Sequence, residues 1–188
     1  ADAAAQKAQK LLDEAQKAQT DADKALENAR NTPPSVQTGG DLTLNAGGSI
    51  GKPDNALDTQ VGGKTNLNSG GNVNLSEQGD MHLGEVQNPE NAELRLDSTG
   101  GITSDSVLVG SHLEANALGG SLDVRTDVDS MSGTAAENIT VNNAGDLKIG
   151  DLTANGQVNV KADGHLRAGT VPEGTANITA GTLHLTAG

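Results

Sequence analysis

The chain contains no cysteine and no aromatic residue, and only 5 of its 188 residues are proline. The lack of cysteine excludes disulfide bridges, thiol catalysis and thiolate metal sites. A globular core of this size normally uses aromatic side chains for bulk, so their absence favours an interior built from thin layers of aliphatic residues. The composition therefore predicts a narrow, layered core and disfavours a rounded enzyme core.

Long hydrophobic runs are also missing. No apolar run approaches the roughly 18 residues that a membrane-spanning helix requires, and no signal peptide opens the sequence. We therefore expect no membrane insertion, and we expect any export signal to lie outside this sequence. The net charge of −13 repels phosphate backbones and anionic lipids, so we also expect no nucleic-acid partner.

The first segment, residues 1–31, is rich in Ala, Gln, Lys and Leu, which favour helices, and a Thr-Pro-Pro tripeptide follows it. Its apolar residues recur at heptad spacing and are mostly alanine. The pattern predicts an Ala-rich amphipathic α-helix over residues 1–31, then a Pro-containing linker over residues 32–38. We interpret the helix as a cap or spacer, with a helix-pairing, dimerising segment as the alternative, because small side chains allow a close helix partner.

From Gly39 onward, short runs of alternating apolar and polar residues are separated by Gly, Asn, Asp and Ser. Examples are DLTL, NVNL, ELRL, SLDV, NITV and QVNV. Alternation with a period of two predicts strands with one buried face, and Gly and Asn suit tight corners. Such runs are too short to form stable structure alone, so we expect them to pair with one another.

Apolar residues recur at a nearly fixed interval through this region. Five of them lie 19 residues apart: Val109, Val128, Leu147, Leu166 and Leu185. A second track recurs every 19 to 21 residues, with alternative anchors two residues away: Leu42, Val61, Met81, Ile102, Leu122, Val141, Val160 and Ala180. A period near twenty residues is typical of a solenoid. The spacing predicts an all-β parallel β-helix over residues 39–188, with about seven coils of 19–20 residues and loop insertions near 51–64, 84–93 and 127–137.

Four phrases of this region carry a family resemblance: GGDLTLNAGGSI, GGNVNLSEQGDMHLGEV, AENITVNNAGDLKIGDL and GQVNVKADGHLRAGTV. They resemble the haemagglutinin-type repeats of filamentous haemagglutinin and related large exoproteins of Gram-negative bacteria. The resemblance implies a right-handed β-helix that forms the shaft of a large secreted adhesin, exported by an outer-membrane partner in two-partner secretion. The segment 1–31 lies outside the repeats and no NPNG-type secretion motif is present, so the resemblance implies an interior piece of a longer chain.

The histidines do not have the spacing of a metal site. No two of the four are close helical neighbours: His82, His112, His165 and His184. Three of them lie beside strand leucines at alternate positions, which predicts that they point outward into solvent. We expect no zinc site.

Three aspartates, Asp123, Asp127 and Asp129, have intervals that suit calcium ligands. The segment nevertheless lacks the glycine and the terminal glutamate of an EF-hand loop. We therefore expect neither a metal nor a cofactor.

Catalysis is also disfavoured. Polysaccharide lyases and hydrolases built on β-helices need clustered carboxylates with a basic residue on one face. The repeat region has three arginines, Arg95, Arg125 and Arg167, and none of them falls next to a carboxylate pair in a recurring position. With no aromatic residue to stack on a sugar, we expect no catalytic residues and no enzyme.

The expected function is a structural or adhesive shaft segment of a large bacterial surface adhesin, secreted or held at the surface of a Gram-negative cell. The expected partners are the outer-membrane two-partner-secretion transporter of the full-length chain, a host or bacterial receptor or glycan, and a partner helix for residues 1–31. Two alternatives use the same repeat: the stalk of a contact-dependent toxin-delivery protein, and a glycan-binding module. A polysaccharide lyase is disfavoured.

Overall fold

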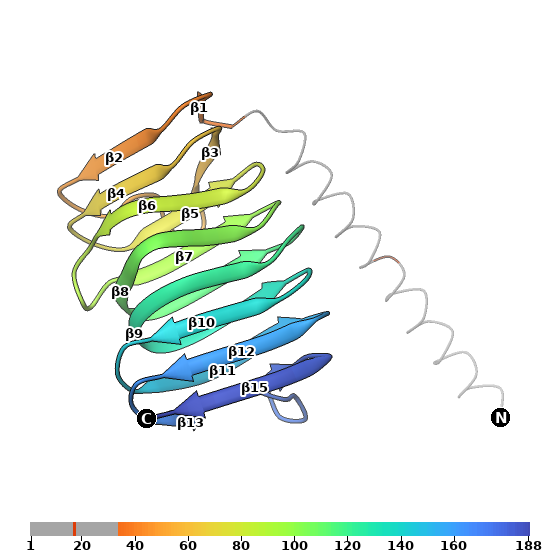
Figure 1. Cartoon of the computed structure of the whole chain (residues 1–188). Coiled ribbons are helices and arrows are strands. Elements are labelled where there is room, and N and C mark those ends of the chain that lie inside the picture. Colours follow the sequence, from red (N-terminus) through yellow and green to blue (C-terminus); the bar gives the residue numbers. More distant parts are fainter. Residues whose placement is uncertain (1–16, 18–33) are drawn as a thin grey trace, which may run out of the picture. The chain divides into compact units, whose positions relative to one another are not determined.

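Short parallel β-strands stack on one another through residues 34–188, and Figure 1 shows them as successive rungs from β1 to β15. This computed structural model describes residue 17 and residues 34–188, so the helix predicted over residues 1–31 falls, Lys17 apart, outside the described residues. The rungs form about seven turns of a parallel β-solenoid. The all-β class and the parallel stacking predicted from the period are confirmed.

The strands all belong to one hydrogen-bonded sheet, and every pairing between named strands is parallel. Their bounds are β1 (Val36–Thr38), β2 (Leu42–Ala46), β3 (Leu57–Val61), β4 (Thr65–Ser69), β5 (Val73–Glu77), β6 (Met81–Gln87), β7 (Glu93–Ser98), β8 (Ile102–Ala117), β9 (Leu122–Ala135), β10 (Ile139–Asn143), β11 (Leu147–Ala154), β12 (Gln157–Ala162), β13 (Leu166–Ala168), β14 (Ile178–Thr179) and β15 (Thr182–Ala187). No helix among the described residues is long and apolar enough to cross a membrane.

Each turn contributes to two faces of the solenoid. The front face in Figure 1 contains β2, β4, β6, the first part of β8, the first part of β9, β10, β12 and β15. The back face contains β1, β3, β5, β7, the later parts of β8 and β9, and the strands β11, β13 and β14. Strands β8 and β9 are long because each continues around the corner from front to back.

The interior consists of columns of aliphatic side chains, because alternate residues of every strand point inward and parallel pairing places like positions over one another. One front-face column contains Leu122, Ile139, Val158 and Leu183. The next contains Val124, Val141, Val160 and Leu185. These thin layers are filled without aromatic residues, as the composition predicts.

The predicted 19-residue track does not follow one column. Leu147 does lie opposite Leu166, but Leu185 lies opposite Val160, in a different column. The reason is that coil length varies: Leu122 pairs with Ile139, 17 positions on, whereas Val158 pairs with Leu183, 25 positions on. The second predicted track, with intervals of 19 to 21 residues, does follow one column through Met81, Ile102 and Leu122.

The irregular segments only partly follow the three predicted insertions. Residues 51–56 form a loop before β3, and residues 88–92 separate β6 from β7. Residues 127–135 instead continue strand β9, because its inward side chains stay buried through the corner. An additional irregular segment, residues 169–177, lies between β13 and β14 and accounts for the longest coil.

At several corners, an Asp or Asn side chain just before a strand accepts a hydrogen bond from a backbone N–H of the following rung. Asp80 Oδ1, for example, accepts a hydrogen bond from the backbone N–H of Gly101 at 2.7 Å. The residue before that N–H, Gly100, leaves no room for a side chain, since an added Cβ would lie 2.2 Å from the Asp80 oxygen. The same pairing of an Asp or Asn with a glycine one rung on recurs at Asp41 with Gly63, Asn138 with Gly156, and Asp146 with Gly164. This pairing explains much of the Asp, Asn and Gly content of the corners.

Candidate functional site

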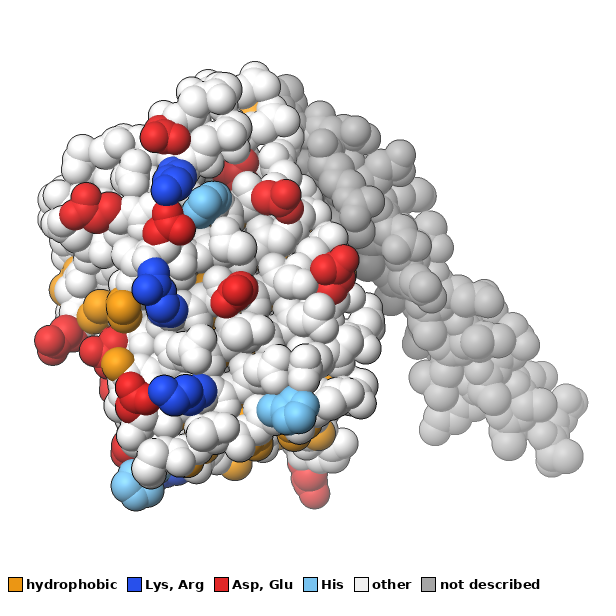
Figure 2. All heavy atoms as spheres, in the orientation of Figure 1, with side chains coloured by type: hydrophobic (Ala, Val, Ile, Leu, Met, Phe, Trp, Pro, Cys, Tyr) orange, Lys and Arg blue, Asp and Glu red, His pale blue; other side chains and the backbone are white. Residues whose placement is uncertain are grey.

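The outward side of the front face presents columns of polar side chains. One column runs along six rungs and contains His82, Thr103, Asp123, Thr140, Asn159 and His184. Figure 2 shows this face: uncharged polar groups cover most of it, and charged side chains of both signs are scattered among them. Any ligand that meets this face would therefore contact hydroxyls, amides and isolated charges.

A bulge in β8 interrupts the front face between Thr103 and Val107, where the register with β9 shifts. Two serines replace the ladder hydrogen bonds that the bulge removes. Ser104 Oγ accepts from the backbone N–H of Arg125 at 3.2 Å, and Ser106 Oγ accepts from the backbone N–H of Val86 at 3.1 Å. The bulge is thus held from both neighbouring rungs.

Asp105 lies at the tip of this bulge and binds two cationic or polar groups from earlier rungs. Its Oδ2 accepts a hydrogen bond from Lys64 Nζ at 2.7 Å, and its Oδ1 lies 3.1 Å from His82 Nε2. We name Lys64, His82 and Asp105 the Asp105 cluster. All three side chains are about half exposed, so the cluster is an accessible charged feature that spans three rungs.

Hydrogen bonds from Lys64 and His82 lower the pKa of Asp105 to about 2, and the same contact with Asp105 raises the pKa of Lys64. The carboxylate is therefore ionised across the physiological range and already holds two donors. A group in that state is a poor proton donor or acceptor. The cluster acts as a cross-link between rungs, of the modest strength usual for exposed ion pairs.

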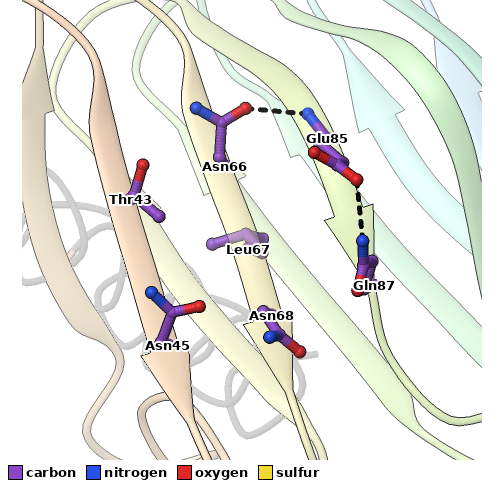
Figure 3. Close-up of a pocket in the computed structure, with 7 residues that line it drawn as sticks. All are labelled: Thr43, Asn45, Asn66, Leu67, Asn68, Glu85 and Gln87. Carbon is purple, nitrogen blue, oxygen red and sulfur yellow. Dashed lines mark hydrogen bonds between the residues drawn. The ribbon is translucent and has the colours of Figure 1, made fainter.

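A shallow hollow lies on the same face over the first rungs, with a volume of about 130 Å³. Its lining comes from β2, β4 and β6: Thr43, Asn45, Asn66, Leu67, Asn68, Glu85 and Gln87. Figure 3 shows these side chains in adjacent rows, with hydrogen bonds from the Glu85 N–H to Asn66 Oδ1 and from Gln87 Nε2 to Glu85 Oε1. Thr43, Asn45 and Asn68 make no side-chain hydrogen bond with any described residue, so their donors and acceptors are available to a ligand.

The back face carries a second charged group that the sequence did not indicate. Arg95 on β7 lies 3.2 Å from Asp97 and 3.5 Å from Glu114, and Asn116 Nδ2 donates to Asp97 Oδ1 at 2.8 Å. The hydrogen bond with Asp97 raises the pKa of Arg95. Asp97 lies two residues from Arg95 on the same strand, whereas Glu114 is one rung away, so only knowledge of the register would have placed Glu114 beside this arginine.

The four histidines considered as metal ligands lie in different parts of the solenoid. His112 is on the back face, where its Nδ1 lies 2.9 Å from Ser130 Oγ, while His184 is exposed on β15. His165 contacts Asp146, whose pKa is lowered by the backbone N–H of His165 and then by its ring; Arg167 contacts the same carboxylate at 3.3 Å. No group of three His, Cys, Asp or Glu residues within residues 34–188 is arranged to hold a metal ion.

The three aspartates considered for calcium alternate along β9 and all point outward. Asp123 belongs to the front-face column, whereas Asp127 and Asp129 line a separate depression with Glu90 at the corner. The corner of β9 thus separates Asp123 from the other two aspartates, and the three do not form a group that could hold a metal ion among the described residues.

Glu77 is a carboxylic acid inside the solenoid, with 1% of its surface exposed. Its oxygens accept hydrogen bonds from Thr59 Oγ1 at 2.5 Å and from the backbone N–H of Val61 at 2.7 Å. Burial raises the pKa of Glu77, and the two hydrogen bonds oppose that rise. The side chain of Glu77 is enclosed inside this corner. We therefore assign this acid a structural role.

An equivalent corner is occupied by Asn143, which is also buried. Its Oδ1 accepts from Thr126 Oγ1 at 2.8 Å and from the backbone N–H of Val128 at 3.0 Å. The two corners share a Thr-x-Val segment whose hydroxyl and N–H bind one side chain of the next rung. They differ in that one acceptor is an acid and the other a neutral amide.

Comparison with known proteins places this chain among repeat proteins. A family model described as repeats of unknown function (DUF5649) matches residues 20–87 and 136–188, more than half of the chain. The chain belongs to the DUF5649 family. No curated protein and no solved structure matches the chain. Within the DUF5649 match, the hollow lies wholly in the first segment, whereas Asp105 and Arg95 lie between the two segments.

Proposed function

We propose that residues 34–188 are a shaft segment of a large bacterial surface adhesin, with no catalytic role of their own. The observation that carries this proposal is the set of internal columns that continue from rung to rung. Each rung lengthens such a stack by about 4.8 Å while contacting only its neighbours. Repetition therefore supplies length and stiffness, which a shaft needs. The coil is right-handed in this proposal, the hand that parallel crossover connections nearly always take.

We propose that the full-length chain is held at the surface of a Gram-negative cell or secreted from it. The resemblance to haemagglutinin-type repeats supports export of the full-length chain by an outer-membrane two-partner-secretion transporter. Attachment then falls to another part of that chain, which contacts a host or bacterial receptor or glycan. The same shaft would serve as the stalk of a contact-dependent toxin-delivery protein. A toxin domain found elsewhere in the full-length chain would favour this alternative over an adhesin.

A replacement experiment tests the shaft. Residues 34–188 of the full-length protein are exchanged for an unrelated β-solenoid with the same number of turns, and adhesion of the displaying cells is measured. A shaft supplies only length, so we expect adhesion to be kept at equal surface display. Loss of adhesion at equal display would overturn the proposal and assign binding to this segment.

The hollow favours a glycan-binding module as the second candidate. Thr43 and Asn45 on β2 and Asn68 on β4 line this shallow depression with hydroxyl and amide groups that bond to no other described residue. A glycan array probed with the purified chain separates the two functions. Saturable binding that is lost in Asn45→Ala with Asn68→Ala, but kept in Asn142→Ala on β10 outside the hollow, would select the binding module.

A further inference from the structure

We propose that a hollow at one edge of the front face binds a single carboxylate-bearing sugar residue, as one unit of a sparsely charged acidic polysaccharide. The hollow has a volume of about 140 Å³ and is lined by residues on or beside β8, β9, β10 and β12. Each of these strands is paired on both sides, so the hollow belongs to the inner rungs of the solenoid. It shares no residue with the hollow over β2, β4 and β6.

Outward side chains of four consecutive rungs form one wall of this hollow. Val107 lies opposite Arg125. Asn142 lies between Arg125 and Lys161 in the next two pairings. Parallel strands are about 4.8 Å apart, so this column places a guanidinium, an amide and an ammonium group in reach of one sugar ring. Figure 2 shows basic side chains along this edge of the front face, with hydrophobic atoms beside them.

Arg125 differs from the other two arginines among the described residues, because its side chain has no partner there. Arg95 and Arg167 each form ion pairs with carboxylates. The guanidinium of Arg125 makes no hydrogen bond or ion pair with any described residue, although it lines the hollow. A guanidinium binds a carboxylate through two parallel N–H···O bonds. Arg125 is therefore the group that holds the carboxylate of the ligand.

The other lining groups suit the hydroxyls and the C–H face of a sugar ring. The Asn142 amide is exposed and has no partner among the described residues, so it can both donate and accept. The carboxylate of Asp163 lies 3.0 Å from Lys161 Nζ and is also exposed, which leaves lone pairs for a hydroxyl. Val107, 41% exposed, and Ala144 supply an aliphatic surface that a C–H face can cover.

The charges around the hollow select a ligand with one negative charge. Asp123 and Asp127 flank Arg125 on the outward side of β9, and Asp163 lines the hollow. These carboxylates repel a densely charged partner, such as a nucleic acid, a heavily sulfated glycan or an acidic peptide, more strongly than a single carboxylate. The volume is also below the roughly 300–1,000 Å³ of pockets that enclose a whole small molecule. The hollow therefore suits one sugar acid within a longer, mostly neutral polysaccharide.

This contact adds a lateral attachment to the proposed shaft, whose length and stiffness do not depend on it. One such contact is weak, and several shafts on one polysaccharide strengthen it through multivalency. The two proposals can fail separately, because the replacement experiment measures adhesion of cells whereas the experiment below measures sugar binding by the purified chain.

NMR titration of the ¹⁵N-labelled chain with methyl β-D-glucuronide tests the site. We expect the side-chain Nε–H signal of Arg125 and the amide signals of Asn142 to shift and saturate, with a dissociation constant of roughly 1 mM. Methyl β-D-glucoside has the same ring without the carboxylate, and we expect no saturable shift with it. Equal binding of both sugars, or no saturable shift with the glucuronide, would overturn the proposal.

Substitutions of Arg125 identify the group that binds the carboxylate. Arg125→Gln is expected to weaken glucuronide binding about tenfold or more, and Arg125→Lys to weaken it less, because lysine keeps the charge without the paired N–H groups. Arg167→Gln removes the same charge elsewhere and is the matched control, with binding expected to stay unchanged. Asn45→Ala with Asn68→Ala, in the other hollow, is also expected to leave it unchanged.

Two further results would contradict the site. Unchanged glucuronide binding by an Arg125→Gln variant that circular dichroism shows to be folded would place the sugar elsewhere. A hexaglutamate peptide that binds the wild type more tightly than the glucuronide does would replace the sugar with an acidic peptide as the partner.

Discussion

Val160 and Leu185 are neighbours in one internal column, yet they have opposite surroundings. Val160 on β12 lies between Val141 and Leu185 and is 2% exposed, whereas Leu185 on β15 has a neighbour on one side only and is 48% exposed. Both are aliphatic residues at the inward position of a similar strand. The difference shows that full burial of an inward side chain at these positions needs a rung on both sides.

Glycines show the same contrast between covered and open rungs. Gly70 faces the carbonyl oxygen of Gly47 one rung earlier, whereas an added Cβ on Gly47 has no neighbour within 4 Å among the described residues. The two residues occupy equivalent corners. A glycine is therefore required where rungs meet and is dispensable where the stack is open.

The largest effect is expected from breaking the column where it is covered. Val160→Asp places an unpaired charge among aliphatic side chains and should lower the free energy of unfolding by about 3 kcal/mol or more. Leu185→Asp should lower it by less than about 1 kcal/mol, as an exposed substitution does. Denaturant unfolding at low protein concentration measures both. Equal losses for the two variants would contradict the covered-versus-open comparison.

Glycine substitutions sharpen the comparison at the corners. Gly70→Ala forces a methyl group against the Gly47 carbonyl and should cost about 1–3 kcal/mol through displaced backbone. Gly47→Ala meets no atom and should leave stability within about 0.5 kcal/mol of wild type. Thermal unfolding followed by circular dichroism distinguishes them, and a neutral Gly70→Ala would mean that the rungs lie farther apart than described.

The two buried corners yield a pH-dependent test. Glu77→Gln keeps a neutral amide oxygen that can accept from the Val61 N–H and from Thr59 Oγ1, as the Asn143 oxygen accepts from Val128 and Thr126. Burial raises the folded-state pKa of Glu77 above 4.5. Its stabilising contribution is therefore fully present below pH 4.5 and is lost as the pH rises through the folded-state pKa.

We expect Glu77→Gln to raise the free energy of unfolding by about 1 kcal/mol at pH 7 and to match the wild type at pH 4. Urea unfolding at both pH values measures this difference. Asn143→Asp is the reciprocal variant, and it should become less stable than wild type as the pH rises. A Glu77→Gln variant whose advantage does not depend on pH would show that Glu77 does not change its ionisation in this range.

The smallest effect is expected on the exposed surface. Asp105→Asn removes the carboxylate from Lys64 and His82, but the cluster is half exposed and solvent screens it. Because the pKa of Asp105 is lowered to about 2, its contribution is present above pH 3.8 and is lost as the pH falls through about 2. Melting temperatures of Asp105→Asn and of Asp123→Asn, an outward control, should differ slightly at pH 7 and coincide near pH 2. A large loss at pH 7 would mean that the bulge depends on the ion pairs more than on Ser104 and Ser106.

The sequence supported the fold better than it supported the register or the site. Alternating runs located most strands, and the period indicated stacking, because both signals are local. The 19-residue track joined Leu166 to Leu185 across two columns, since the irregular segment 169–177 lengthens that coil unevenly. Arg95 and Glu114 are neighbours only through the register, so the ion pair between them could not be predicted from spacing. The assignment to an adhesin shaft remains a prediction.

Composition and alternation by themselves determined that this chain builds thin aliphatic layers from short parallel strands. Alternation every two residues buries one face of each short strand, and the period near twenty residues indicates that successive strands stack in parallel. The tertiary structure alone decided which residues meet: the partner of each leucine, the bulge that brings Asp105 to Lys64, and the corners that enclose Glu77. These contacts depend on where loops and bulges absorb the differences in coil length, because the column of Leu122, Ile139, Val158 and Leu183 continues although successive members lie 17 to 25 residues apart.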